Sequence, residues 1–189
     1  IPNLLDENSD HRLHLPNQVG LVIQNLDGFI VESEKIGRKF LQRFIKKIQD
    51  VPIKVLNEHS SPNDIDHLAA PMQKGERWGL LSDAGLAAIA DPGASLIRRL
   101  HGLKIPVKTF PGPSSIVYAL QMSGIYAQTF TFHGYLPRKP DAIKIFFKYL
   151  KKNHTHICIE APYRTDKLIH TLIDYLPPEA SLSVASNLT

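Results

Sequence analysis

Short apolar runs alternate with longer amphipathic segments through the first part of the chain. The spacing predicts strands over residues 28–33 (GFIVES), 53–58 (IKVLNE) and 77–83 (RWGLLSD), and a helix over 34–49. Ser61-Pro62-Asn63-Asp64 combines a cap residue, a proline at the first helical position and an early acid, so a second helix starts there. Another is expected from Asp91 to Leu103. Strands that alternate with helices in this way predict βαβ units and a parallel sheet.

The segment PGPSS at 111–115 interrupts this pattern, and we expect the boundary between an N-terminal domain (1–111) and a C-terminal domain (112–189) there. Before it, residues 105–110 are strand-like. The second half is expected to contain helices over 114–122, 139–152 and 166–175, and strands over 129–136, 155–160 and 181–186. It shows fewer strands than a closed α/β domain needs, so we expect the C-terminal domain to be incomplete.

Composition narrows the function classes. The formal net charge of +4 permits a nucleic-acid partner without requiring one. The single cysteine, Cys158, rules out a disulfide framework and a cysteine-rich zinc site, and it suits a cytoplasmic location. No stretch reaches the roughly 18 apolar residues of a membrane span, and no signal-peptide pattern opens the chain.

Several common catalytic motifs are missing from the sequence. It contains no G-x-G-x-x-G, no G-x-x-x-x-G-K-[ST], no G-x-S-x-G and no H-E-x-x-H, which disfavours dinucleotide, P-loop, serine-hydrolase and zinc-protease chemistry. His154 and His156 alternate on an expected strand, but no third ligand lies near them in the sequence. No metal site is therefore expected.

Three glycine- and proline-rich corners are the candidate binding elements: 82–85, 91–93 and 111–115. The first follows an expected strand, and parallel sheets bind ligands beyond the carboxyl ends of their strands. The Asp83 carboxylate can accept hydrogen bonds from two adjacent hydroxyls, as on a ribose, and the apolar residues 86–90 can border an adenine. Ser114 and Ser115 open a helix whose backbone donors suit a carboxylate. The alternative is three structural turns with capping aspartates, which the spacing alone favours.

Four motifs that follow one another along the chain favour ligand binding over simple structural turns. They are SDAGLAAIADPG (82–93), PGPSSIVYALQMSG (111–124), FTFHGYLPRKP (130–140) and IEAPYR (159–164). Together they resemble the tetrapyrrole methylase superfamily, and in particular its ribosomal RNA small-subunit methyltransferase I family. Fainter matches place Pro2 in the family's first proline-containing loop, Glu32 with Lys35 at an E-D-T-R-like position, and Glu58-His59 at an E-H-N-like position.

The resemblance implies an α/β, two-domain tetrapyrrole methylase fold: an N-terminal parallel sheet with flanking helices, a C-terminal α/β domain, and S-adenosylmethionine in the cleft between them. It also implies a homodimer. Together with the helix-start argument for Ser114, it gives the expected cofactor-binding residues: Pro2, Asp83, Ala84, Gly85, Ser114, Ser115, Ile116 and Ile159.

The chain departs from the family pattern mainly on the substrate side. Leu86-Ala87 replaces the family's Thr-Pro, the first loop lacks the usual Gly-Asn-Leu, and the late R-E-L-T-K becomes Ser186-Asn187-Leu188-Thr189. The substrate is therefore less certain than the fold. A protein that binds without catalysing remains an alternative.

The expected reaction is methyl transfer from a sulfonium by in-line displacement, which needs alignment of donor and acceptor and no metal. If the acceptor is a ribose 2′-hydroxyl, a base must help to remove its proton. The candidate bases are Glu32, His59, His133 and Glu160; Glu160 has a structural alternative as an ion-pair partner of Arg164. The three hypotheses are 2′-O-methylation of ribosomal RNA, methylation of a tetrapyrrole, and RNA binding without turnover.

An RNA or small-ribosomal-subunit partner would need a basic face, and two helices offer one. The first set is Lys35, Arg38, Lys39, Arg43, Lys46 and Lys47. The second is Lys144, Lys148 and Lys151, with Arg138 and Lys139 in the preceding loop facing substrate. Ordinary solvated helix faces are the alternative for both sets.

Overall fold

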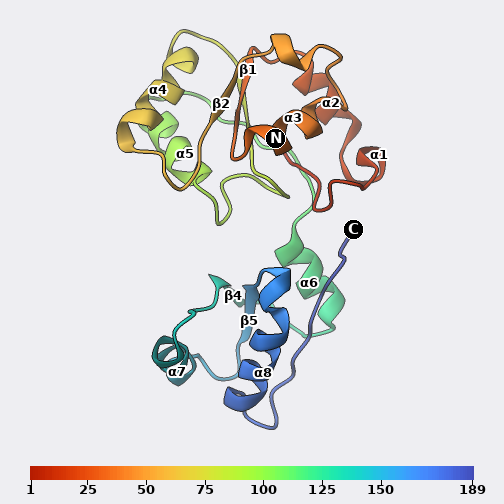
Figure 1. The fold of residues 1–189 in the computed structure, drawn as a ribbon, viewed down its shortest axis with the longest axis vertical. Coiled ribbons are helices and arrows are strands. Elements are labelled where there is room, and N and C mark those ends of the chain that lie inside the picture. Colours follow the sequence, from red (N-terminus) through yellow and green to blue (C-terminus); the bar gives the residue numbers. More distant parts are fainter. The chain divides into compact units, whose positions relative to one another are not determined.

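A computed structural model describes all residues, 1–189, and divides them into two compact units, Ile1–Ser115 and Ile116–Leu188. This division lies between Ser115 and Ile116, four residues after the boundary expected at 111/112, and Thr189 is grouped with the first unit. Each unit is an α/β structure with its own parallel strands (Figure 1). None of the helices has the length and apolar character that a bilayer crossing requires.

The first unit contains a three-stranded parallel sheet of β1 (Gly28–Val31), β2 (Ile53–Val55) and β3 (Trp78–Leu81), in the order β2-β1-β3. In the register, Phe29 lies between Ile53 and Gly79. All three strands fall within the predicted runs. The helices of this unit are α1 (His11–His14), α2 (Asn17–Ile23), α3 (Glu34–Leu41), the 3-10 turn η1 (Ile48–Asp50), α4 (Pro62–Gln73) and α5 (Gly93–Gly102).

Both faces of this sheet are covered, because β1 is apolar on both sides. Phe29 and Val31 point to a core that includes Val19 and Ile23 of α2 and Phe40 and Leu41 of α3. Ile30 points to the opposite face, where it joins Leu68 and Ala69 of α4 and Leu96 and Leu100 of α5. Figure 1 shows α1, α2 and α3 on one side of the strands and α4 and α5 on the other. A continuous apolar run is typical of such doubly covered strands.

Helix α4 begins as the sequence predicts. The Ser61 hydroxyl accepts a hydrogen bond from the Asp64 backbone N–H, the Asp64 carboxylate accepts one from the Ser61 N–H, and Pro62 stands at the first helical position. This capping box satisfies backbone donors that a helix start leaves unpaired.

Helix α3 is shorter than the predicted 34–49, because it ends at Leu41. Beyond it, Phe44 turns to make edge contacts with Phe40 and with His11 of α1, with ring centroids 5.4 and 4.8 Å apart. The apolar spacing continues at helical period to residue 49, but the packing of Phe44 against Phe40 and His11 ends the helix earlier. Helices α1 and α2 lie before residue 28, in a part of the chain for which the hydrophobic pattern predicts no element.

The second unit contains α6 (Ser115–Ser123), β4 (Phe130–Tyr135), α7 (Pro140–Lys148), β5 (Thr155–Ile159), the 3-10 turn η2 (Pro162–Arg164) and α8 (Thr165–Tyr175). Strands β4 and β5 pair in parallel, with an irregularity between Phe132 and Tyr135. The strands predicted over 105–110 and 181–186 do not form. Their alternating residues find no neighbouring strand to pair with, and a strand pattern without a ladder partner gives extended coil.

Candidate functional site

The candidate site lies where β1 and β3 end, side by side at the carboxyl edge of the first unit's sheet. The helix that follows β1, α3, packs on one face of the sheet, and the helix that follows β3, α5, packs on the other. The two connections leave in opposite directions, so the ends of β1 and β3 flank a topological switch point. Open α/β sheets bind their ligands at such points.

Asp83, two residues beyond β3, is held by the two residues that follow β1. Its Oδ1 accepts a hydrogen bond from the Ser33 backbone N–H (3.0 Å), and its Oδ2 accepts one from the Ser33 hydroxyl (2.5 Å). The Asp83 N–H donates to Oε2 of Glu32 (3.1 Å). A carboxylate has about four acceptor positions, so about two remain for hydroxyls of a ligand. Asp83 is fixed in orientation and retains the capacity that the ribose hypothesis requires.

Asn3 orders the same loop from the N-terminal segment. Its buried side-chain amide donates to the carbonyl oxygens of Ser82 (2.9 Å) and Asp83 (3.1 Å). The backbones pair as well: the Asn3 N–H donates to the Gly85 carbonyl, and the Gly85 N–H donates to the Leu4 carbonyl. Neither Asn3 nor Ser33 belongs to a recognisable sequence motif, although Asn3 directly follows the predicted cofactor residue Pro2, and Ser33 directly follows the candidate base Glu32.

Two glycines bring three of the predicted segments of the first unit together. Gly85 adopts φ +67°, which only glycine adopts readily, and a Cβ there would lie 3.3 Å from the Pro113 carbonyl oxygen. A Cβ at Gly112 would overlap the ring of Pro2. Pro2 and Pro113 are both fully buried. The structure therefore places Pro2, Asp83, Ala84 and Gly85 in one region, with the 111–113 corner against it.

The second corner of the opening motif has a structural role. The Asp91 carboxylate accepts hydrogen bonds from the backbone N–H groups of Ala88 (2.8 Å) and Gly93 (2.7 Å). These bonds hold a loop in which Ala88 and Ala90 adopt φ of 66° and 60°, values that are unfavourable for alanine. Asp91 therefore holds a structural turn, as the alternative of structural turns expects.

The carboxyl edge of the sheet is acidic. Burial raises the pKa of Glu32 from its usual value of 4.5, and the charges of Asp83, Asp91 and Glu58 raise it further, while the hydrogen bond from Asp83 lowers it. Burial likewise raises the pKa of Asp91. An acidic, partly buried edge favours a ligand that carries positive charge.

The four candidate bases have different environments. Glu32 touches Asp83. His59 is exposed, and its Nε2 lies 3.6 Å from a Glu58 carboxylate oxygen. In the second unit, His133 Nε2 lies 2.8 Å from His156 Nδ1. Glu160 is almost fully buried and lies 3.2 Å from the Arg164 guanidinium, so the structural ion pair left open by the sequence is present. Of the four, Glu32 is the one whose side chain is hydrogen-bonded to an expected cofactor residue, Asp83.

The remaining expected cofactor residues lie at the start of α6 and the end of β5. Ser115 is the first residue of α6, Ser114 immediately precedes it, and Ile116 lies in its first turn. Ile159 is the last residue of β5, opposite Tyr135 in the register. No group of three or more His, Cys, Asp or Glu side chains is arranged to hold a metal ion.

Comparison with known proteins adds evidence that is independent of this geometry. No protein-family model matches the chain. A ribosomal RNA small subunit methyltransferase I from Coprothermobacter proteolyticus is 31% identical over 170 residues, which cover 89% of this chain and 75% of that protein. Proteins of the same name from Vibrio cholerae and Thermotoga maritima are each 29% identical, and the matches cover 58% and 67% of their lengths. The chain thus spans little more than half of the Vibrio protein.

Among solved structures, that of the methyltransferase CobJ has a TM-score of 0.58 at 12% identity, covering 89% of this chain and 73% of CobJ. At this identity the likeness concerns the fold, and it agrees with the predicted tetrapyrrole methylase architecture. The relative from Coprothermobacter proteolyticus identifies the family: the chain belongs to the ribosomal RNA small subunit methyltransferase I family.

Proposed function

We propose that this protein binds S-adenosylmethionine and transfers its methyl group to a ribose 2′-hydroxyl of small-subunit ribosomal RNA. The observation that supports the proposal most is the anchored Asp83 loop, which lies at a topological switch point in a chain of this family. Asp83 is at the place where the sheet would bind a ligand, and its carboxylate has acceptor capacity left for a ribose.

The residues of the first unit fit the adenosyl group chemically. Asp83 would accept the ribose hydroxyls, with Ser33 and Asn3 fixing its orientation. Ala84 and Gly85 have little or no side chain, so the loop backbone can approach a flat base closely. The acidic edge around Glu32 would favour the positive sulfonium. When bound, the cofactor supplies an already electrophilic methyl group.

We further propose that Ser114, the first α6 residues Ser115 and Ile116, and Ile159 of β5 complete the cofactor site, with Pro2 at its border. The first backbone N–H groups of a helix lack intrahelical acceptors and suit a carboxylate. The cleft between the two units, the homodimer and the cytoplasmic location remain predictions from the family resemblance.

Glu32 is the base that we propose for the acceptor hydroxyl. It contacts Asp83 through a hydrogen bond of 3.1 Å, and its raised pKa brings the carboxylate closer to the range in which it can accept a proton near neutral pH. The alternatives are less suited, since His59 is solvent-exposed and Glu160 is paired with Arg164.

Methyl incorporation tests the function directly. The protein is incubated with S-adenosylmethionine carrying a labelled methyl group and with small ribosomal subunits, and the RNA is then hydrolysed in alkali. A 2′-O-methyl group blocks alkaline cleavage, so the expected label appears in alkali-resistant dinucleotides. Label in mononucleotides would indicate base methylation instead, and an absence of label with intact RNA binding would favour the non-catalytic alternative.

The tetrapyrrole alternative has weaker support, because the likeness to CobJ concerns the fold alone. Incorporation of label into a tetrapyrrole, with none in RNA, would contradict our proposal.

A further inference from the structure

Two short segments concentrate the positive charge of this protein, and residues 34–47 in the first unit carry the same net charge of +5 as residues 138–152 in the second. Residues 138–152 carry six cationic side chains and one acid, a net charge of +5, whereas the whole chain carries +4. All other residues together therefore carry a net charge of −1. The six cations, which we name the α7 basic surface, are Arg138, Lys139, Lys144, Lys148, Lys151 and Lys152.

We infer that the α7 basic surface is where this protein docks on the sugar-phosphate backbone of RNA, and that the cationic face near α3 is not. The choice of RNA as the partner rests on the proposed function. The choice of surface rests on the structure, which distinguishes two basic faces that the sequence left equal.

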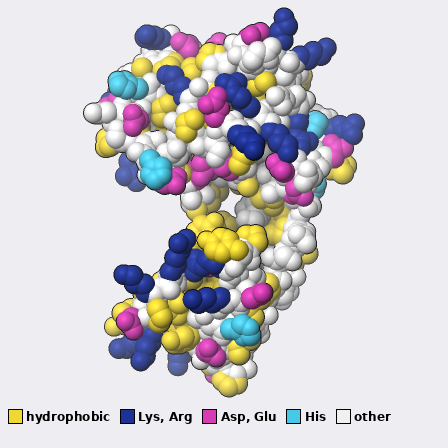
Figure 2. Space-filling model, viewed as in Figure 1, with side chains coloured by type: hydrophobic (Ala, Val, Ile, Leu, Met, Phe, Trp, Pro, Cys, Tyr) yellow, Lys and Arg dark blue, Asp and Glu magenta, His cyan; other side chains and the backbone are white.

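The six cations of the α7 basic surface are free to contact a ligand. All six residues are exposed, and none of their side chains forms an ion pair with a carboxylate. Lys144 and Lys148 are four residues apart on α7 and so lie on the same side of the helix. Figure 2 shows Lys and Arg side chains gathered over the α7 region, with little acidic surface among them. Phosphate binding releases counterions from such a surface, which favours association.

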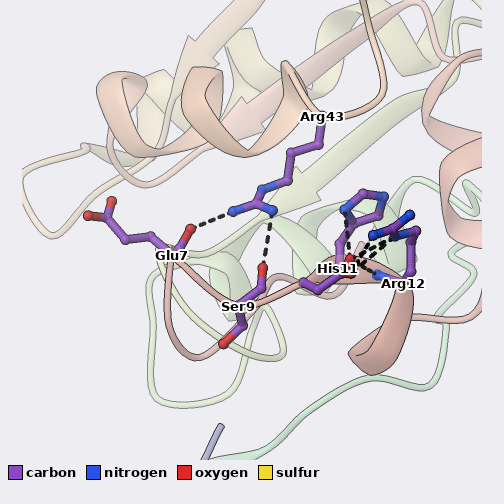
Figure 3. Close-up of polar contacts among 6 residues, drawn as sticks. Glu7, Ser9, His11, Arg12 and Arg43 are labelled. Carbon is purple, nitrogen blue, oxygen red and sulfur yellow. Dashed lines mark hydrogen bonds and ion pairs between the residues drawn. The ribbon is translucent and has the colours of Figure 1, made fainter.

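The face near α3 is different, because three of its cationic side chains already have hydrogen-bond or ion-pair partners within the protein. The Lys39 ammonium lies 2.9 Å from a Glu7 carboxylate oxygen, and the Arg38 guanidinium lies 2.8 Å from Glu34. Arg43 donates to the backbone carbonyls of Ser9 and Glu7, which fixes the N-terminal segment (Figure 3). Three of the six cations counted from the sequence thus have internal partners.

The packing of α7 favours a nucleic acid over a membrane surface. An amphipathic helix binds a bilayer by inserting its apolar face. On α7 the two phenylalanines are already packed, and only Ile145 (57% exposed) is left: Phe146 makes an edge contact with His133 of β4 (4.9 Å between ring centroids), and Phe147 stacks on Tyr175 of α8 (5.2 Å). The exposed side instead offers Tyr149, which is 75% exposed and has the Lys148 ammonium 5.6 Å from its ring centroid. Exposed aromatic rings among cations are typical of surfaces on which bases stack.

A matched pair of triple variants tests the inference: Lys144→Gln/Lys148→Gln/Lys151→Gln on the α7 basic surface and Lys35→Gln/Lys46→Gln/Lys47→Gln near α3. Both remove the same charge. Binding to a fluorescein-labelled hairpin of small-subunit ribosomal RNA is followed by anisotropy over a range of salt concentrations. We expect the α7 variant to lose at least about tenfold in affinity and its salt slope to fall by about 2 to 3, since each phosphate contact contributes about 0.7 to 0.9. The α3 control should change by less than about threefold.

Equal losses in the two variants, or a loss confined to the control, would overturn the inference while leaving RNA as the partner. Tight binding of the wild-type chain to vesicles of anionic phospholipid, with none to RNA, would overturn both the inference and the proposed substrate. Calorimetry with S-adenosylmethionine distinguishes a failure of the proposed cofactor site from a failure of the proposed docking surface. Both triple variants should bind the cofactor as the wild type does, so a failure of cofactor binding alone contradicts the proposed site and leaves the docking surface intact.

Discussion

At the scale of residues, the candidate site depends on a few hydrogen bonds between segments far apart in the sequence. Ser33 holds both carboxylate oxygens of Asp83, Glu32 accepts from the Asp83 N–H, and Asn3 holds the carbonyls before and at Asp83. The motif around Asp83 could be found from the sequence, because glycine and aspartate mark the turn. Its supporting residues could not, because a serine or asparagine has no pattern that indicates which distant loop it will bind.

Replacement of Ser33 by alanine tests this support. Ser33→Ala removes the hydroxyl that donates to Asp83 Oδ2 and keeps the backbone donor to Oδ1. A hydrogen bond to a charged group contributes about 1.5–3 kcal/mol to folding, and its loss leaves the Asp83 carboxylate less firmly oriented, so we expect the affinity for S-adenosylmethionine to fall. Ser95→Ala is the control, because that exposed hydroxyl only donates to the Pro92 carbonyl. Unchanged calorimetric affinity in Ser33→Ala would show that Asp83 does not need this anchor.

Glu32 gives the first unit a pH dependence of known sign. Its pKa is raised in the folded state, so its contribution to stability is present below the unfolded pKa of about 4.5 and is lost as the pH rises through the folded value. At pH 7 the ionised carboxylate therefore opposes folding. Glu32→Gln keeps an oxygen for the Asp83 N–H and removes the charge. We expect this variant to be more stable than the wild type at pH 7 and equally stable near pH 4.

Urea unfolding followed by Trp78 fluorescence measures this effect, because the only tryptophan of the chain lies in β3 of the first unit. Glu179→Gln, an exposed change of the same charge, provides the control. If the stability that Glu32→Gln gains over the wild type at pH 7 were equally large at pH 4, the gain would have a cause other than the ionisation of Glu32.

At the scale of elements, the sequence predicts most strands and helices but not all of their ends. Helix α4 has a strong local signal and begins where predicted. Helix α3 ends early because Phe44 packs against Phe40 and His11, which is a tertiary effect. The runs at 105–110 and 181–186 alternate as strands do, yet pairing depends on a neighbour that local pattern does not reveal.

The capping box of α4 should contribute measurably to stability. Ser61→Ala removes the hydroxyl that accepts from the Asp64 N–H. Replacement of such a cap costs about 1 kcal/mol, so we expect the free energy of unfolding of the first unit to fall by about that amount. Trp78 fluorescence in urea measures the change. Ser181→Ala, in the exposed C-terminal segment, should have no effect; a similar loss in both variants would mean that the cap contributes nothing specific.

The strand pair β4–β5 contains a histidine pair that should weaken it in acid. His156 Nε2 lies 2.8 Å from the Lys151 carbonyl oxygen and must therefore donate, which leaves Nδ1 of a neutral His156 to accept from His133 Nε2–H. Burial and the neighbouring histidines lower the pKa of His133 from 6.5. The neutral form of His133 therefore stabilises the fold fully above its unfolded pKa of about 6.5. This contribution is lost as the pH falls through the lower pKa that His133 has in the folded protein.

Hydrogen exchange of the β4 and β5 amides measures this loss. Between about pH 7 and pH 5, after correction for intrinsic exchange, we expect protection to decline in the wild type and to decline less in His133→Gln. His170→Gln, on the exposed side of α8, should retain the wild-type profile. The same decline in His133→Gln as in the wild type would place the titrating group elsewhere.

At the scale of the whole molecule, two compact units carry different parts of the proposed function. The first contains the anchored Asp83 loop, and the second contains the α7 basic surface and α6 from Ile116 onward. Family membership follows from relatives of about 30% identity, and the fold agrees with that of CobJ. The sequence motifs indicated both. Which basic face remains free for a partner required the structure, because the contacts of Lys39 and Arg43 with the distant residues Glu7 and Ser9 decide it.

The measurement that tests the central claim most directly is a calorimetric titration of S-adenosylmethionine into the wild type and Asp83→Ala. The account predicts binding of one cofactor per wild-type chain and a loss of at least about tenfold in affinity for Asp83→Ala, with folding of both verified by Trp78 fluorescence. Absence of binding to the folded wild type, or equal affinity in the two proteins, would contradict it.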